Sequence, residues 1–261
     1  MTLRHVGVLG LGEAGGTIAS GLAAAGCLVR GWDPVVERVA AGVDRTETPI
    51  GAVAGAELVL SLTTAAHAAD AASSVASALG AGQLYADLNT TAPTLKREVA
   101  ATIGAIGVAF ADVALLGPVP ARALGTPALV SGDGAERFAE HLRPFGMPVE
   151  IVGGEPGDAA GLKLLRSVFM KGLAASVLES IEGARVRGAD DWLRREIADV
   201  LGEPLLERLL SGSVTHAERR RDEMEAAAGY LEELGVEPRV TRAAAAWLES
   251  LGTGAEGACP P

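Results

Sequence analysis

Three glycines near the start of the chain have the spacing Gly-x-Gly-x-x-Gly and stand between an apolar run and a stretch that favours a helix. Gly10 permits a tight turn, Gly12 lets the main chain approach a pyrophosphate, and Gly15 lets a helix pack closely on a strand. The free N–H groups at the start of such a helix attract an anion. The alternative is a glycine-rich turn without a ligand. The pattern predicts a dinucleotide-binding turn whose cofactor contacts are Gly10, Leu11, Gly12, Glu13, Ala14 and Gly15.

An acidic residue, Asp33, ends the next apolar run, 18 residues after Gly15. At this place a carboxylate accepts hydrogen bonds from the ribose hydroxyls of a bound dinucleotide. The carboxylate would repel a 2′-phosphate, although Arg30 or Arg38 could offset that repulsion. The sequence therefore favours NAD over NADP as the cofactor.

Two of the three lysines share one face of a predicted helix. Lys163, Ser167 and Lys171 follow one another at intervals of four residues, so their side chains line one face of that helix. The chain has 19 arginines, and a lysine, unlike an arginine, can lose its proton in a protein. A lysine desolvated or placed beside a second cation can donate a proton to a carbonyl or imine as hydride arrives. Lys163 is the predicted proton donor. Three roles stay open for Lys171, which are that second cation, a substrate anchor and a surface charge.

The elements that must position these residues follow two patterns. From residue 6 to about 154, short apolar runs alternate with Ala-rich helical stretches, which is typical of βαβ units around a parallel sheet. The predicted strands are 6–9, 28–31, 58–62, 84–88, 109–113, 128–131 and 150–152. The predicted helices between them are 15–25, 35–41, 66–79, 93–106 and 135–144. From Gly157 onward only helical patterns remain, with breaks expected at 188, 202–204, 211–213 and 235–238.

The change of pattern falls in the segment 153–156. We therefore expect an α/β Rossmann domain with a parallel sheet over residues 1–155, which binds the dinucleotide. An all-α domain over residues 156–261 is expected to follow it and to contribute to the substrate site.

Composition narrows the classes of partner. A formal net charge of -11 opposes binding to nucleic acid or to an anionic membrane surface. Cys27 and Cys259 match neither a metal-ligand spacing nor a disulfide framework, which predicts no metal site and suits a reducing cytoplasm. The N-terminal segment that ends at Cys27 could pass for a secretion signal, but Glu13 lies inside its apolar part. We therefore expect a cytoplasmic protein with a small-molecule substrate.

Several motifs together resemble the 3-hydroxyacid and 6-phosphogluconate dehydrogenase superfamily. They are the glycine turn, the loop Asp87-Leu-Asn89-Thr-Thr91-Ala-Pro93, the strand with Asp112 and its Gly117 turn, and the helix from Gly157 to Lys163. The segments 115–120 and 216–224 resemble a branch whose C-terminal helical domain is phosphogluconate-dehydrogenase-like.

The resemblance implies that Lys163 is the catalytic acid/base and that Asn89 and Thr90 lie beside the nicotinamide ribose or the substrate. Asn89, Ser167 and Lys171 complete the candidate catalytic group, and Thr63 is also expected among the cofactor contacts. In dimeric relatives the C-terminal helices contact the partner subunit, so the resemblance implies a homodimer. The basic segment 216–221 is then either an anion-binding site or a solvated helix start.

Two departures from the hydroxyacid members bear on the substrate. Those members have Ser-Gly-Gly in the turn after the Asp112 strand, where this chain has Leu116-Gly117-Pro118. Leu116 has no hydroxyl and Pro118 has no N–H, so a substrate carboxylate would lose two donors. The second departure is Ser167, where the family usually has Asn.

The sequence thus predicts an NAD(P)-dependent oxidoreductase that moves hydride between nicotinamide and a hydroxy acid or related carbonyl compound, with Lys163 as acid/base. An imine reductase on the same scaffold is the first alternative. A non-catalytic NAD(P)-binding regulatory protein is the second.

Overall fold

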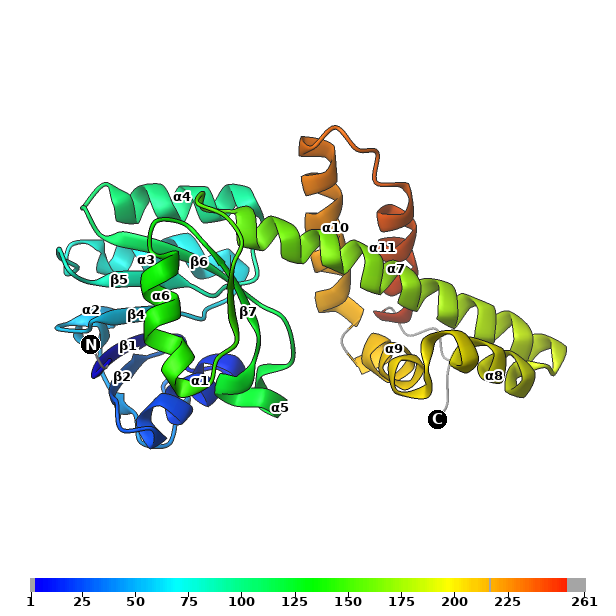
Figure 1. Cartoon of the computed structure of the whole chain (residues 1–261), viewed down its shortest axis with the longest axis horizontal. Coiled ribbons are helices and arrows are strands. Elements are labelled where there is room, and N and C mark those ends of the chain that lie inside the picture. Colours follow the sequence, from blue (N-terminus) through cyan, green and yellow to red (C-terminus); the bar gives the residue numbers. More distant parts are fainter. Residues whose placement is uncertain (1–2, 216, 253–261) are drawn as a thin grey trace. The chain divides into compact units, whose positions relative to one another are not determined.

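The computed structural model describes residues 3–215 and 217–252. The chain divides into two compact units between Lys163 and Leu164, the first of mixed strands and helices and the second of helices (Figure 1). Of the helices within these described ranges, none combines the length and the apolar character that a membrane crossing requires.

The first unit is built on an eight-stranded sheet with the order β3-β2-β1-β4-β5-β6-β7-β8. Its strands are β1 (His5–Leu9), β2 (Leu28–Trp32), β3 (Asp44–Arg45), β4 (Leu58–Ser61), β5 (Leu84–Asp87), β6 (Ala109–Leu115), β7 (Ala128–Ser131) and β8 (Val149–Ile151). Neighbouring strands are parallel except β6 and β7. The predicted α/β Rossmann fold is confirmed.

Helices cover both faces of the sheet because its central strands are apolar on both sides. They are α1 (Glu13–Ala24), α2 (Pro49–Val53), α3 (Ala68–Ala76), α4 (Pro93–Gly104), α5 (Val119–Arg122) and α6 (Ala135–Leu142). Three short 3-10 turns, η1 (Ala65–His67), η2 (Ala123–Gly125) and η3 (Arg143–Phe145), complete the unit.

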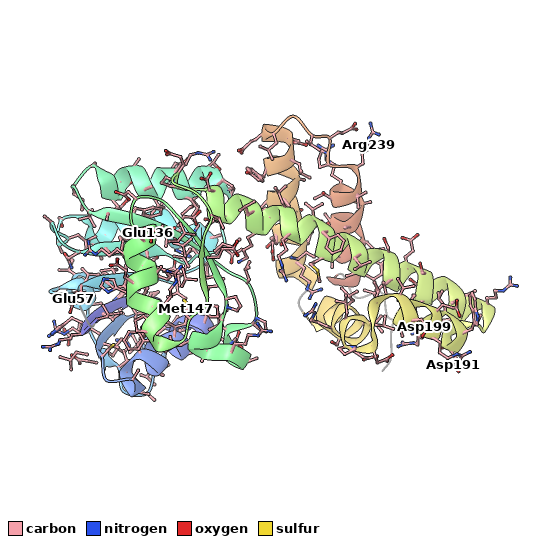
Figure 2. The ribbon with its side chains drawn as sticks, in the orientation of Figure 1. Glu57, Glu136, Met147, Asp191, Asp199 and Arg239 are labelled. Atoms are coloured by element: carbon pink, nitrogen blue, oxygen red, sulfur yellow. The ribbon has the colours of Figure 1, made fainter. Side chains whose placement is uncertain are left out.

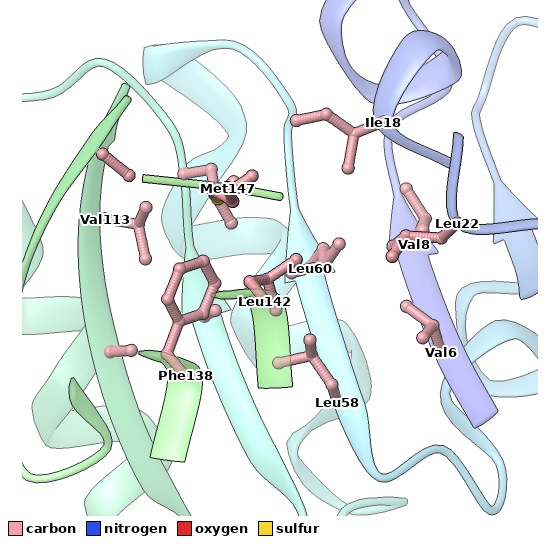
Figure 3. Packing of buried hydrophobic residues seen from close by; sticks show 14 of the residues in the cluster. Val6, Val8, Ile18, Leu22, Leu58, Leu60, Val113, Phe138, Leu142 and Met147 are labelled. Atoms are coloured by element: carbon pink, nitrogen blue, oxygen red, sulfur yellow. The ribbon is translucent and has the colours of Figure 1, made fainter. Parts of the chain in front are cut away.

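One face of the sheet packs against α1 and α6. Figure 3 shows Ile18 and Leu22 from α1 beside β1, and Phe138 from α6 between neighbouring strands. These side chains are fully buried, and burial of each contributes about 1.5–3 kcal/mol relative to exposure. On the other face, α2, α3 and α4 contribute a second cluster that includes Val75, Val99 and Ile103. The two clusters fix the sheet whose carboxyl edge carries the glycine turn.

The connection between β6 and β7 differs from the fully parallel sheet that we expected. Asp112 pairs with Ser131 and Leu115 with Ala128, an antiparallel register. The intervening chain holds only α5 and η2, and it does not cross the sheet. A parallel pair needs a crossover along the whole strand length, so this short return produces an antiparallel pair.

The predicted helix at 35–41 is wrong. This segment forms turns, and the short strand β3 and helix α2, neither of which we predicted, follow it. Val35, Val36 and Val39 are all exposed, so the segment has no apolar face to pack on the sheet. A helix this short is not stable without such packing.

The second unit contains five helices among the described residues. They are the C-terminal part of α7 (Asp158–Arg187), α8 (Asp190–Leu201), α9 (Glu203–Thr215), α10 (Ala217–Glu233) and α11 (Arg239–Gly252). Ala174, Val177 and Ile181 of α7 pack with apolar residues of α8 and α9. The solvent side of α8 carries charges such as Asp191 and Asp199 (Figure 2). Met224, Ala244 and Leu248 join α10 to α11. The predicted all-helical second part is confirmed.

Two helices of this unit end at a glycine. Gly188 and Gly202 adopt positive φ angles of 73° and 78°, a conformation that suits glycine, and they follow α7 and α8. The break predicted at 211–213 is absent, because α9 continues through it. The Ser211 hydroxyl donates to the Glu207 carbonyl one turn earlier, a bond that the helix tolerates.

The first turn of α7 belongs to the sheet-containing unit. We expected the boundary at 155/156, whereas the compact units divide after Lys163. The N–H groups of Gly157 and Ala160 both donate to Asp112 of β6 over 3.0 Å. These bonds attach the start of α7 to the sheet and carry Lys163 with it.

Candidate functional site

The glycine turn joins β1 to α1. Gly10 has a φ angle of 98°, and a Cβ there would lie 2.3 Å from the Leu62 carbonyl oxygen. A Cβ at Gly15 would lie 2.0 Å from the Gly10 carbonyl oxygen. Both positions therefore exclude any side chain, as predicted for a tight turn and a close helix–strand contact.

Gly12 is the N-cap of α1 and differs from its two neighbours. A Cβ at this position would meet only the Arg38 Nη1 atom at 3.9 Å, so the space before the helix is open. No side chain caps this end of the helix. The N–H groups of the first turn of α1, where Glu13 and Ala14 stand, thus border an open space of the kind that a pyrophosphate fills.

Asp33 lies at the end of β2 and is 2% exposed. Its Oδ2 accepts the Leu11 N–H and its Oδ1 accepts the Val35 N–H, each over 2.8 Å. The Arg38 guanidinium adds longer contacts of 3.3 and 3.4 Å to the two oxygens. The acidic residue that the sequence singled out is therefore held against the glycine turn, with an arginine beside it.

The loops after β4 and β5 bring Thr63 and Asn89 together. The side-chain amide of Asn89 donates to Asp87 Oδ1 over 2.6 Å and to Ser61 Oγ over 3.0 Å. The Thr63 hydroxyl donates to Asn89 Oδ1 over 3.3 Å. Asn89 is buried, so these bonds fix its amide at the carboxyl ends of β4 and β5.

Lys163 reaches the same loop. Its Nζ donates to Thr90 Oγ1 over 2.8 Å, although the two residues are 73 positions apart in the sequence. Thr90 is exposed and Lys163 is half-buried. Because β1, β4 and β5 are parallel, their carboxyl ends share one edge of the sheet. The structure therefore places Lys163, Thr90, Asn89 and the glycine turn along that edge, where ligands bind in such folds.

The turn after β6 has few donors for a substrate. The Leu116 N–H is taken by the Pro127 carbonyl oxygen over 2.8 Å. Pro118 has no N–H. Two of the three residues of the turn thus offer no main-chain donor, in agreement with the departure seen in the sequence.

In the helical unit, Ser167 and Lys171 form a cluster with Glu223 of α10. Lys171 Nζ lies 2.9 Å from Glu223 Oε1 and donates to Ser167 Oγ over 3.1 Å. The Ser167 hydroxyl also donates to Glu223 Oε1. The charge of Lys171 is thus paired within the unit, which weakens the case for a bare second cation.

Sequence reasoning missed Glu223 and the buried Lys96. Lys96 is 1% exposed, and its Nζ lies 3.1 Å from Asp112 Oδ1 and 3.4 Å from Asp87 Oδ1. A signal existed, because Lys96 occupies the same helical face as the buried Val99 and Ile103. A lysine at an apolar position needs a buried partner.

Some predicted residues stay outside this geometry. His216 lies outside the described residues. Arg221 pairs with Asp222 and Glu225 at the surface of α10. The residues that the structure describes contain no group of three or more His, Cys, Asp or Glu side chains placed to hold a metal ion.

Residues 5–154 match the family described as the NAD binding domain of 6-phosphogluconate dehydrogenase. The chain belongs to this family. Residues 184–251 match a second family, described as a domain of unknown function, DUF1932. The predicted superfamily and its branch are both confirmed.

Curated proteins match part of the chain. An uncharacterized 28.5 kDa protein of Methanothermus fervidus is 31% identical over 144 residues, which cover 54% of this chain and 55% of that protein. The NAD-dependent L-serine dehydrogenase of Pseudomonas aeruginosa is 29% identical over 151 residues, 55% of this chain and 50% of that enzyme. The chain thus matches about half the length of these relatives.

Solved structures match nearly the whole chain. A conserved hypothetical protein from Sinorhizobium meliloti 1021 is 28% identical with a TM-score of 0.81, covering 99% of this chain and 92% of that one. The Mycobacterium tuberculosis 3-hydroxyisobutyrate dehydrogenase with L-serine is 20% identical with a TM-score of 0.84, covering 99% and 96%. An imine reductase from Pseudomonas sp. is 20% identical with a TM-score of 0.66, covering 98% and 96%. The last two show the fold alone.

Proposed function

We propose that this protein is an NAD(P)-dependent oxidoreductase that moves hydride between nicotinamide and a hydroxy acid or related carbonyl compound, with Lys163 as the acid/base. The observation that carries the proposal is the contact of Lys163 Nζ with Thr90 Oγ1, 2.8 Å long, at the edge of the sheet that holds the glycine turn. It puts a proton-bearing group on the edge where a dinucleotide binds in this fold.

The residues present fit a dinucleotide. The open space in front of Gly12 and the uncapped start of α1 suit a pyrophosphate. Leu11, Glu13, Ala14 and Gly15 complete the turn around it, and Asp33 stands where the adenosine ribose would lie. When bound, the nicotinamide supplies or accepts the hydride.

The chain's own residues would handle the proton and the orientation. In the reducing direction the Lys163 ammonium gives a proton to the substrate oxygen, and in the oxidising direction the neutral amine takes it back. Thr90 Oγ1 holds the Lys163 amine in place. Asn89, anchored by Asp87 and Ser61, presents its amide oxygen to Thr63 and orients the ribose or the substrate.

The cofactor we propose is NAD. Asp33 accepts its two short bonds from the main chain, and the longer contacts from Arg38 are the ones that ribose hydroxyls would replace. The Arg38 side chain is half exposed, so its displacement costs little. A 2′-phosphate would instead lie against the Asp33 carboxylate.

Ser167 and Lys171 are proposed as substrate contacts. Glu223 holds both of them, so their orientation on α7 is fixed before a substrate arrives. Because the turn at Leu116 and Pro118 offers few N–H donors, we propose a substrate that does not depend on that turn to bind a carboxylate.

An imine reductase is the second candidate. The turn at Leu116 has few N–H groups that could donate to a substrate carboxylate. This favours an imine reductase, because a cyclic imine needs no such donors. In that reaction Lys163 or another donor protonates the nitrogen. A binding protein without turnover is the remaining alternative.

We also propose that the protein is cytoplasmic and forms a homodimer through the second unit, which lies within the predicted domain 156–261. Phe169, Val186, Trp192 and Val200 of this unit are each more than half exposed, and an interface between two copies would remove apolar surface of this kind from water. Light scattering coupled to size-exclusion chromatography tests the dimer. A monomer at micromolar concentration would refute it.

A substrate screen tests the proposed activity. Oxidation is followed by NADH absorbance with a panel of hydroxy acids that includes L-serine and 3-hydroxyisobutyrate, and reduction with the matching carbonyl compounds and cyclic imines. Turnover of an acid or carbonyl compound that depends on Lys163 supports the first candidate. Turnover of imines alone selects the second, and tight NADH binding without turnover leaves the binding protein.

A further inference from the structure

Lys96 of α4 places an ammonium group between two carboxylates inside the first unit. Its Nζ donates to the Asp87 carbonyl oxygen over 2.6 Å and lies 3.4 Å from Asp87 Oδ1 and 3.1 Å from Asp112 Oδ1. All three residues are at most 1% exposed. Charges are buried in this way only when they are paired, because an unpaired charge in the interior strongly destabilises the fold.

One carboxylate of this cluster controls the loop after β5. Asp87 Oδ1 accepts both the main-chain N–H and the side-chain amide of Asn89, over 2.8 and 2.6 Å. Thr90, the partner of Lys163, is the next residue. The position of the Asp87 carboxylate therefore determines where Asn89 and Thr90 lie.

The other carboxylate controls the start of α7. Asp112 Oδ2 accepts the N–H groups of Gly157 and Ala160, both over 3.0 Å, and the Ser131 hydroxyl over 3.3 Å. An anion at a helix N-terminus is stabilised by the helix dipole. Lys163 follows Ala160 by about one turn, so the Asp112 carboxylate sets the height of Lys163 relative to the sheet.

We propose that Lys96 is a positioning residue that brings Lys163 and Thr90 into register by joining the carboxylates that hold their two segments. The effect of Lys96 on catalysis rests on the proposed function, whereas its effect on the position of Lys163 does not. A lysine fits this role better than an arginine, because a compact ammonium fits between three oxygens in a small space.

The test compares wild type with Lys96→Met, which keeps most of the stem and removes the charge. Because two buried carboxylates without a cation repel each other and destabilise the fold, the double variant Lys96→Met/Asp112→Asn, which keeps the cluster's net charge, is measured beside it. Glu98→Gln, on an exposed position of the same helix, is the control. Circular dichroism and thermal unfolding verify the fold of each variant.

The decisive readout is the pH dependence of Lys163 acylation by a lysine-selective reagent, followed by peptide mass spectrometry in the whole protein. A folded Lys96 variant is expected to shift this profile and to retain NADH binding, while Glu98→Gln matches wild type. If a substrate is turned over, kcat falls on the order of 100-fold in the Lys96 variant, because the acid/base is misplaced.

A folded variant with the wild-type Lys163 profile and wild-type kcat would overturn the proposal. A chain that turns over no substrate would refute the proposed function instead, and the acylation profile would still decide the role of Lys96. A loss of stability with an unchanged profile would assign Lys96 a structural role alone.

Discussion

Lys163 Nζ and Thr90 Oγ1 lie 2.8 Å apart, and this bond joins the start of α7 to the loop after β5. Each residue stands on a segment that is held by its own buried aspartate, Asp112 for α7 and Asp87 for the loop. Both segments that carry this bond are thus held in place before any ligand binds. The following experiments test what this arrangement does.

Removal of the Thr90 hydroxyl should impair catalysis. Thr90→Val keeps the shape of the side chain and deletes the acceptor of the Lys163 bond. Because Thr90 is exposed, this bond adds little to the free energy of unfolding, and its role is to hold the Lys163 amine in place. We expect kcat to fall by about tenfold or more with little change in the stability of the fold. Thr102→Val, at a half-buried threonine near the end of α4, serves as the control in steady-state assays. Equal kcat values in the two variants would argue against a role for Thr90.

A methyl group at the glycine turn should block the dinucleotide. Because the Cβ of Gly12→Ala meets no atom nearer than 3.9 Å, this variant is expected to fold with a stability within about 1 kcal/mol of wild type. Its NADH affinity should drop at least about tenfold, a change of roughly 1.4 kcal/mol. Calorimetric titration measures the affinity, with Gly80→Ala as the control because that position also has open space. Wild-type affinity in Gly12→Ala would place the pyrophosphate elsewhere.

Asp33 should select NADH over NADPH. Asp33→Asn removes a charged acceptor and is expected to weaken NADH binding by about tenfold or more. Arg38→Ala should leave NADH binding unchanged, because the arginine only covers the outer side of the carboxylate. Titrations of both cofactors decide the matter. Tighter NADPH binding by wild type, lost in Arg38→Ala, would show instead that Arg38 receives a 2′-phosphate.

The stability of the first unit should depend on His141. Burial, and secondly Arg137, lowers the pKa of the His141 imidazole from its usual 6.5. The unfolded chain therefore binds more protons at acid pH, so this contribution to stability is present above pH 6.5 and is lost as the pH falls below it.

The free energy of unfolding is measured with urea at about pH 7.5 and at about pH 5.5. Its decrease from the higher to the lower pH should be larger for wild type than for His141→Gln. The variant has no imidazole to protonate, so it serves as the reference. An equal loss in both proteins would mean that His141 titrates alike in the folded and unfolded chain.

Local patterns in the sequence predicted much of the fold. The apolar runs of β1, β4 and β5 and the glycines of the first turn are local signals, and the structure reproduces them within a residue or so. The failures have a different origin. The segment at Val35 and Val36 has a helical composition but no surface to pack on, and the antiparallel β7 depends on the path of the connection that precedes it.

The candidate site was predictable where each residue carries its own signal. Gly12, Asp33 and Lys163 are recognisable by type and spacing. Lys96 and Glu223 act through partners that are far away in the sequence, such as Asp112 and Ser167, so their roles appear only when the chain is folded. The contact of Lys163 with Thr90 is of this second kind.

The most direct test of Lys163 as the acid/base is the turnover of two substitutions at this residue with a substrate found in the screen. Lys163→Met removes the proton donor, and Lys163→Arg keeps the charge but cannot exchange the proton. We predict that kcat falls by about 100- to 10,000-fold in both, with NADH affinity unchanged by calorimetry. Turnover near the wild-type rate in either variant would contradict the account.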